Sequence, residues 1–206
     1  MPSWNARSRR GCWLLQSVYG LQSRGEGGAM SHIKTYAILP PAYIEYDPLA
    51  PDVAARVGAL IEAAAPWARV EHIGSTAIPG CAGKGIVDLV ALYPRGKLEA
   101  TRAAIDDLEF QPQRTGHEFP DERPMRVGAI DFAESVYRLH VHIVAADSDE
   151  AVALRRFRDM LCADSGLRDA YQARKRAILE SGASTSADYT HAKGEFINAV
   201  IGSSVR

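Results

Sequence analysis

Apolar residues recur at helical spacing in one early segment of the chain. Val53, Val57, Leu60, Ile61 and Ala64 recur at positions i, i+4, i+7, i+8 and i+11. This spacing places them on one face of a helix, and Pro66 would end it. The pattern predicts a helix over residues 51–65.

Several later segments show the patterns of strands. Residues 69–73 form a short β-prone run, and residues 85–93 are apolar at almost every position, as in a strand buried on both faces. Residues 125–132 and 136–145 indicate a strand pair. A helix is predicted over 96–107, and the polar, proline-interrupted stretch from His117 to Pro124 is predicted to be a mobile loop.

The last third of the chain has helical patterns. Asp147 and Glu150 have the spacing of a capping box, with Asp147 as the N-cap, and Gly166 and Gly182 are expected to divide three helices. The order of one helix, then strands, then a helical C-terminal third predicts an α+β fold with a mixed β-sheet flanked by helices.

The N-terminal residues differ from the rest. Residues 1–29 carry four arginines against one acid and show no sustained apolar period, which predicts a disordered extension before one domain over 30–206. Met30 follows a Gly-Gly-Ala run, so we hypothesise that it is the true start. A targeting or disordered arm is the alternative.

Composition narrows the class of partner. The formal net charge of −1 shows no basic excess, which argues against nucleic acid, and no apolar run approaches the roughly 20 residues of a membrane span. The three cysteines, Cys12, Cys81 and Cys162, match neither a zinc site nor a disulfide framework. We expect reduced thiols and a cytoplasmic location.

The first chemical candidate is a turn that precedes an acid. Gly74, Ser75 and Thr76 form a small-residue turn, and Asp88 follows inside the apolar run 86–90. Such a turn can bind a phosphate, although turns often use these residues without any ligand. An isolated carboxylate in a buried strand is costly unless it is paired, protonated or bound to a cation, so Asp88 is the candidate ligand for Mg²⁺.

The second candidate is a pair of histidines. His140 and His142 are two residues apart in a predicted strand, so their side chains lie on one face, about 7 Å apart. With Asp88 on a neighbouring strand they could form a metal or phosphate site. The alternative is two half-buried, hydrogen-bonded histidines.

The third candidate is basic. Lys193 and Arg158 are predicted to lie on or beside apolar helix faces, where a cation needs a partner, and Lys84 precedes the Asp88 strand. Four further basic residues lie on the predicted C-terminal helices, and most of them are expected to be solvated surface charges. The four residues are Arg155, Arg156, Arg174 and Lys175.

Seven motifs, in this order, resemble those of the GrpB family (UPF0157). The resemblance covers about residues 36–201 and ends with Tyr171, Tyr189 and Lys193. Its motifs are Tyr46-Asp47-Pro48, His72 to Thr76, Ile78-Pro79-Gly80, Gly83-Lys84-Gly85, Val87-Asp88, His140-Val141-His142 and Phe157-Arg158-Asp159. The resemblance implies a nucleotidyltransferase-like fold.

The sequence departs from the wider superfamily at the metal-binding acids. Active members carry an acid pair and a third acid on a later strand, which together hold two Mg²⁺ ions. Here Val90 occupies the second acid position, His140 and His142 stand on the later strand, and Gly85 replaces the family's usual proline.

The leading hypothesis is a protein that binds a phosphorylated ligand, a nucleoside triphosphate with Mg²⁺, and transfers a nucleotidyl group to an unknown acceptor. Asp88, His140 and His142 would be catalytic. The ligand would be bound by Gly74, Ser75, Thr76, Lys84, Arg158 and Lys193. One alternative is a non-catalytic nucleotide-binding, coenzyme A-related or assembly module, since the resemblance includes domains fused to dephospho-coenzyme A kinases. The other is a Zn²⁺ or Fe²⁺ site of Asp88, His140 and His142.

Overall fold

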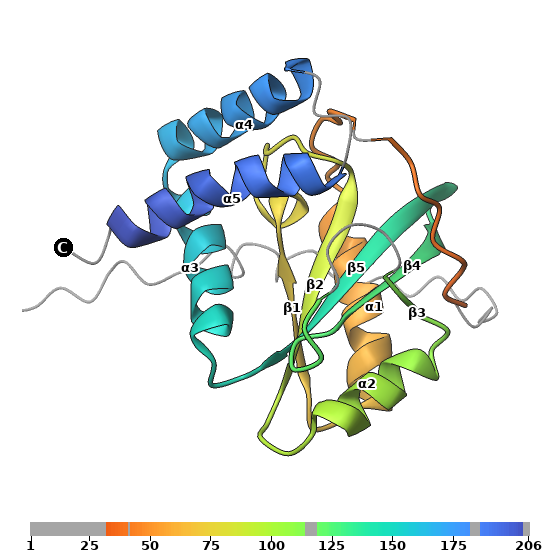
Figure 1. Cartoon of the computed structure of the whole chain (residues 1–206). Helices are drawn as coiled ribbons and strands as arrows, with labels where there is room; N and C mark the ends of the chain where they lie inside the picture. The colour runs from red at the N-terminus through yellow and green to blue at the C-terminus, as the bar shows by residue number, and fades with distance from the viewer. Residues whose placement is uncertain (1–31, 41, 114–118, 182–185, 204–206) are drawn as a thin grey trace, which may run out of the picture. The chain divides into compact units, whose positions relative to one another are not determined.

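The central element is a five-stranded mixed sheet, seen in a computed structural model (Figure 1). The structure describes residues 32–40, 42–113, 119–181 and 186–203, and side chains of the last helix from Lys193 to Gly202. The predicted extension 1–29, Met30, His117 and Gly182 lie outside these ranges. The strands are β1 (Arg69–Ile73), β2 (Ile86–Tyr93), β3 (Gln111–Pro112), β4 (Met125–Phe132) and β5 (Ser135–Ala145), in the order β1-β2-β5-β4-β3.

One strand pair is parallel and the others are antiparallel. β2 and β5 run parallel, with Asp88 opposite His140 and Val90 opposite His142. β1 pairs antiparallel with β2, and β4 with both β5 and β3. The predicted α+β class, mixed sheet and helical C-terminal third are confirmed. The two-residue strand β3 is too short to leave a pattern and was not predicted.

Two helices cover one face of the sheet. α1 (Ala50–Ala64) and α2 (Leu98–Asp106) pack on alternate residues of β2 and β5, among them Val87, Leu89 and Leu139. Asp47 fixes the approach to α1, because one carboxylate oxygen accepts the Leu49 N–H at 2.8 Å and the other accepts the Tyr137 hydroxyl at 2.8 Å. The Tyr46-Asp47-Pro48 motif therefore has a structural role.

Three helices lie on the other side. α3 (Asp149–Ala163) packs on Val90 and Leu92, and it forms a second apolar cluster with α4 (Ser165–Glu180), α5 (Ser186–Ser203) and the turn that contains the 3-10 helix η1 (Ser75–Ala77). α4 and α5 lie side by side and extend over this turn (Figure 1). None of the described helices is long and apolar enough to cross a bilayer.

The caps of the C-terminal helices differ from the prediction. Ser148, not Asp147, caps α3, because its hydroxyl accepts the Ala151 N–H at 3.2 Å. Asp147 instead pairs with Arg95. α4 begins one residue before Gly166, and its cap is Asp164, which accepts the Leu167 N–H. A serine satisfies a helix N-terminus as well as an aspartate does, so composition alone does not separate adjacent candidates.

The segment 119–124 is a loop, but it has several anchors. Arg123 pairs with Glu150, and the Tyr93 hydroxyl donates to the Glu122 carbonyl at 3.3 Å. The Phe119 ring packs edge-on against His142. Residues 119–124 are therefore attached to β2, β5 and α3. The sequence analysis predicted a mobile loop and did not foresee these contacts.

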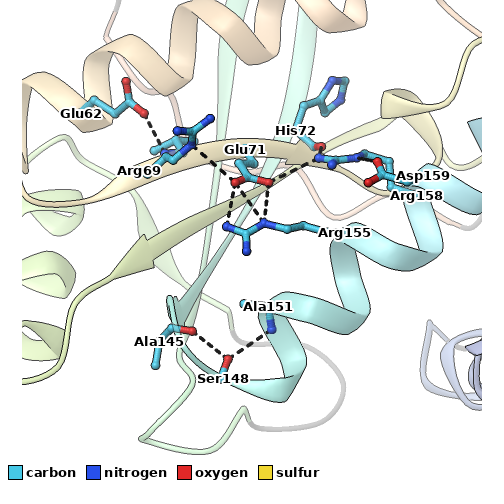
Figure 2. A network of polar contacts seen from close by, with 11 residues as sticks. Glu62, Arg69, Glu71, His72, Ala145, Ser148, Ala151, Arg155, Arg158 and Asp159 are labelled. Carbon is cyan, nitrogen blue, oxygen red and sulfur yellow. Dashed lines mark hydrogen bonds and ion pairs between the residues drawn. The ribbon is translucent and has the colours of Figure 1, made fainter. Parts of the chain in front are cut away.

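An ion-pair network joins α3 to the edge strand β1 (Figure 2). Glu71 accepts three hydrogen bonds from two nitrogens of Arg155, at 2.8, 3.0 and 3.1 Å, and also lies 3.5 Å from Arg158. Arg158 donates to the His72 carbonyl at 3.2 Å and to Asp159 at 2.8 Å. Burial raises the pKa of Glu71, but the hydrogen bond and charge of Arg155 and the charge of Arg158 outweigh it, and the pKa is lowered.

We predict that Glu71→Gln lowers the free energy of unfolding by about 2–3 kcal/mol, because it removes the carboxylate that both Arg155 and Arg158 contact and leaves the largely buried Arg158 with the more exposed Asp159 as its ion-pair partner. The control is Asp147→Asn, which removes one member of a fully solvent-exposed ion pair and should therefore have a much smaller effect on stability. Chemical denaturation of both variants measures the difference, and equal costs would contradict the prediction.

This effect should depend on pH. The pKa of Glu71 lies below its usual value of 4.5, so the carboxylate stabilises the folded state above that pH and the contribution is lost as pH falls through the lowered pKa. The difference in unfolding free energy between wild type and Glu71→Gln should therefore shrink below pH 4.5. A constant difference down to acid unfolding would refute this assignment.

Candidate functional site

Asp88 is a charged residue in the otherwise apolar strand β2, and its side chain lies on the face of the sheet opposite α1. Its neighbours Val87 and Leu89 lie in the core beneath α1, whereas its carboxylate faces the side of the sheet that α3 covers farther along. Asp88 Oδ1 lies 3.3 Å from His140 Nδ1 and 3.9 Å from His142 Nε2. The structure thus brings together all three residues that the sequence analysis assigned to catalysis.

The charge state of Asp88 follows from these neighbours. Burial raises its pKa, but the hydrogen bonds and charges of His140 and His142 act in the opposite direction and are stronger together, so the pKa is lowered below its usual range. Asp88 is therefore a carboxylate at neutral pH, and the two histidines are half-buried partners of it.

The turn before β2 leaves space for this carboxylate. Gly74 has φ +72°, and a Cβ atom at this position would lie 2.5 Å from Asp88 Oδ2. Gly85, on the other side of the turn, has φ +65°. Proline cannot adopt that φ, so the backbone path into β2 seen here requires a residue other than proline at position 85.

Thr76 and Ser75 have different surroundings. The Thr76 hydroxyl donates to the Ile86 carbonyl at 3.2 Å and lies 3.0 Å from His72 Nε2, so its one proton is already used and His72 is the donor to it. Burial, reinforced by the charge of Arg158 and opposed by that of Asp88, lowers the pKa of His72 to about 4. Thr76 is buried and stabilises the turn, whereas Ser75 is half-buried.

A lysine that the sequence analysis assigned to the surface lies beside Ser75. Lys175 is 1% exposed, and its Nζ contacts Ser75 Oγ at 3.1 Å, the Ala82 carbonyl, and Cys81 Sγ at 3.4 Å. The ammonium also lies 4.3 Å from the centre of the Tyr171 ring. Burial lowers the pKa of Lys175, and the nearby Lys193 acts in the same direction.

The sequence did contain a signal for Lys175. Tyr171, Lys175 and Ile178 recur at i, i+4 and i+7 and are the buried residues of α4. The lysine was missed because a charged residue on an apolar face is usually an exposed one whose stem alone is covered. Here the cation is paired with a carbonyl and a hydroxyl inside the protein.

Two further lysines approach the same site. Burial lowers the pKa of Lys84 to about 8, and the positive charges of Lys193 and Arg138 act in the same direction against that of Asp88. Arg138 donates to the Lys84 carbonyl at 2.7 Å. Lys193 of α5 therefore lies close enough to Lys84 of the turn and to Lys175 of α4 for its charge to act on both, and we call these three residues the lysine cluster.

Arg158 has a different position from the one expected of a ligand-binding residue. Its guanidinium is 7% exposed and bonds Glu71, Asp159 and the His72 carbonyl (Figure 2). These contacts hold α3 against β1 beside the site. The interactions of Arg158 are thus those of a structural residue.

The carboxylates do not fit a two-metal site. Asp88 is the one acid of the predicted set, Val90 lies where the second would be, and Asp88 Oδ1 already contacts both histidines. Within the described ranges, no group of three or more histidine, cysteine, aspartate or glutamate side chains is arranged to hold a metal ion. The oxygen ligands that Mg²⁺ prefers are therefore too few. Asp88, His140 and His142 lie close together, but their arrangement does not support the Zn²⁺ or Fe²⁺ alternative.

Comparison with known proteins agrees with this architecture. The GrpB protein family model matches residues 41–202. A UPF0157 protein of Streptomyces coelicolor is 34% identical over 64% of this chain and 66% of its own length, and a UPF0157 protein of Halalkalibacterium halodurans is 28% identical over 77% and 79%. The match thus spans just under two thirds of the Streptomyces protein.

A solved structure has the same fold. The crystal structure of GrpB from Enterococcus faecalis superimposes with a TM-score of 0.58 at 19% identity, over 77% of this chain and 99% of that one. The fold and the family model define a GrpB-type α+β protein. The chain belongs to the GrpB family and shares the fold of that solved GrpB structure.

We predict that Gly74→Ala destabilises the protein and displaces Asp88. The substitution places a residue with a Cβ at a positive φ and brings that Cβ against the Asp88 carboxylate. The loss in unfolding free energy should therefore exceed about 2 kcal/mol, in the upper part of the range for such strain. Gly96→Ala is the matched control, because Gly96 has φ +79° but no atom within 4 Å of the added Cβ. Thermal denaturation should show a smaller loss for Gly96→Ala; equal losses would mean that Asp88 does not restrict this position.

Proposed function

We propose that this protein binds a phosphorylated small molecule, with a nucleotide as the first candidate, where α4 and α5 meet the turn before β2. The observation that carries the proposal is the lysine cluster. The positive charge of Lys193 acts on both Lys84 and Lys175, and Lys175 Nζ contacts Ser75 Oγ at 3.1 Å. The nearby acid, Asp88, lies 3.3 Å from His140 and 3.9 Å from His142. Cations that repel one another in a partly buried site are stabilised by an anion, and a phosphate group supplies one.

The proposed binding residues differ in part from those predicted from the sequence. Gly74 and Ser75 remain, since the Ser75 hydroxyl is half-buried and held by Lys175. Lys84 and Lys193 remain, and Lys175 is added. Thr76 and Arg158 support the site through their own hydrogen bonds, because their polar atoms are used within the fold.

Mg²⁺ does not enter this proposal as a ligand of the protein. The lysine cluster supplies the positive charge that two metal ions would supply in a set of three carboxylates. If the protein transfers a nucleotidyl group, the reaction would depend on the lysine cluster and on His140 and His142. The missing second acid at Val90 favours a second candidate, a module that binds the same ligand without turnover.

Thermal unfolding of the full chain with each of the four ribonucleoside triphosphates tests the proposal. A ligand at 100 times its dissociation constant adds about 2.7 kcal/mol of stability, and we expect a shift of this order both with Mg²⁺ and with EDTA. Lys193→Met and Lys84→Met should each weaken binding by about tenfold or more, since each removes a charge-assisted contact worth about 1.5–3 kcal/mol.

Lys97→Met is the matched control. Lys97 lies over the Trp67 ring beside α2, on the opposite face of the sheet, so its removal should leave nucleotide binding unchanged. Equal losses in all three variants would show a general charge effect. No shift with any triphosphate would refute nucleotide binding, and a shift seen only with Mg²⁺ would show that the lysine cluster does not replace the metal.

A further inference from the structure

A tyrosine from the start of the described chain reaches the catalytic candidates. The Tyr36 hydroxyl lies 3.0 Å from His140 Nε2, and the two rings are tilted at 40° with centres 5.4 Å apart. The other ring nitrogen of His140 faces Asp88 Oδ1 at 3.3 Å. Carboxylate, imidazole and hydroxyl thus form a continuous chain from β2 through β5 to residue 36.

The order of groups fixes the direction of proton transfer. A carboxylate accepts hydrogen bonds, so Nδ1 of neutral His140 carries the proton and Nε2 presents its lone pair to the Tyr36 hydroxyl. This is the arrangement by which an oriented imidazole removes a proton from a nucleophilic hydroxyl. In this chain the hydroxyl belongs to a tyrosine.

The fold holds Tyr36 in place. Its backbone N–H donates to Gln111 Oε1 at 2.9 Å, and two backbone hydrogen bonds, at 2.7 and 2.9 Å, join Lys34 to Ala129 of β4. The segment is therefore attached to β3 and β4. Tyr36 itself is half-buried.

Arg138 connects Tyr36 with the proposed phosphate site. Burial raises the pKa of Tyr36, the positive charge of Arg138 opposes this, and the negative charge of Asp88 adds to it. The same arginine donates to the Lys84 carbonyl at 2.7 Å. The raised pKa keeps the Tyr36 hydroxyl protonated at neutral pH, so the hydroxyl needs a base to react. A phosphate bound near Lys84 would also be near Arg138, because Arg138 contacts the Lys84 carbonyl.

We propose that Tyr36 is the acceptor of the nucleotidyl group, with His140 as its general base and Asp88 as the group that orients His140. The inference rests on the proposed function and names the acceptor for that site. A ribonucleoside triphosphate is the second reactant, and the protein modifies itself.

The step balances as a displacement at phosphorus. Tyr36 Oη attacks the α-phosphorus, so an Oη–P bond forms while the bond from the α-phosphorus to its bridging oxygen breaks and pyrophosphate leaves. The phenolic proton passes to His140 Nε2. The lysine cluster and Arg138 offset the negative charge, and the product is a phosphodiester between Tyr36 and the nucleoside.

Intact-mass measurement and peptide mapping of the full chain, after incubation with each triphosphate in Mg²⁺ or in EDTA, tests the inference. We expect a mass gain of one nucleotidyl group, which is a nucleoside monophosphate less one water, on the peptide with Tyr36. Tyr36→Phe should abolish it, and His140→Gln should slow it by about 100-fold or more, the usual contribution of a general base. Tyr43→Phe is the matched control, because Tyr43 is also half-buried and its hydroxyl accepts from Arg176 instead of facing a histidine.

The outcomes separate this inference from the proposed function. A triphosphate that raises the unfolding temperature without any mass gain would overturn Tyr36 as acceptor and leave ligand binding intact. A mass gain retained in Tyr36→Phe would also overturn it. If no triphosphate binds and none is transferred, both proposals fail.

Discussion

The pairing of Asp88 with His140 is the interaction on which the arrangement of the site depends. An ionised carboxylate inside a sheet is costly unless charged or hydrogen-bonding groups surround it, and the parallel register of β2 with β5 places an imidazole directly opposite. The same carboxylate restricts the adjoining turn, since a Cβ at residue 74 would meet Asp88 Oδ2. The glycine at the turn, the acid on β2 and the histidine on β5 therefore form one geometric unit.

The regular elements were predictable because their signals are local. The α1 apolar positions repeat every three or four residues, and β2 is apolar on both faces, so each pattern identifies its element within two residues of the observed ends. The caps were harder, since Ser148 and Asp147 are adjacent and both residue types satisfy a helix N-terminus. β3, with two residues, has no period at all.

The site was predictable only in part, because some of its contacts join residues far apart in the sequence. Two histidines at a spacing of two and one acid in an apolar strand indicated Asp88, His140 and His142. Nothing in the sequence indicated that Tyr36 meets His140 across 104 positions. Two basic residues lie in surroundings other than those predicted. Arg158 was predicted to bind a ligand but pairs with Glu71 between α3 and β1, whereas Lys175 was predicted to be exposed but is buried against Ser75. Residue type alone does not distinguish a structural cation from a binding one.

The contacts of Asp88 Oδ1 bear both on metal binding and on the Tyr36 contact, because this oxygen lies beside His140 and His142 and His140 in turn contacts Tyr36. An oxygen directed at two imidazoles is less available as one of several hard ligands around Mg²⁺, and in the function proposed above the lysine cluster would supply the positive charge for a phosphate instead. The same contact gives His140 a protonated Nδ1 and a basic Nε2 toward Tyr36. With histidines on β5 where the nucleotidyltransferase-like superfamily is expected to carry an acid, the proposed reaction would therefore activate its acceptor through a base and not through a metal ion.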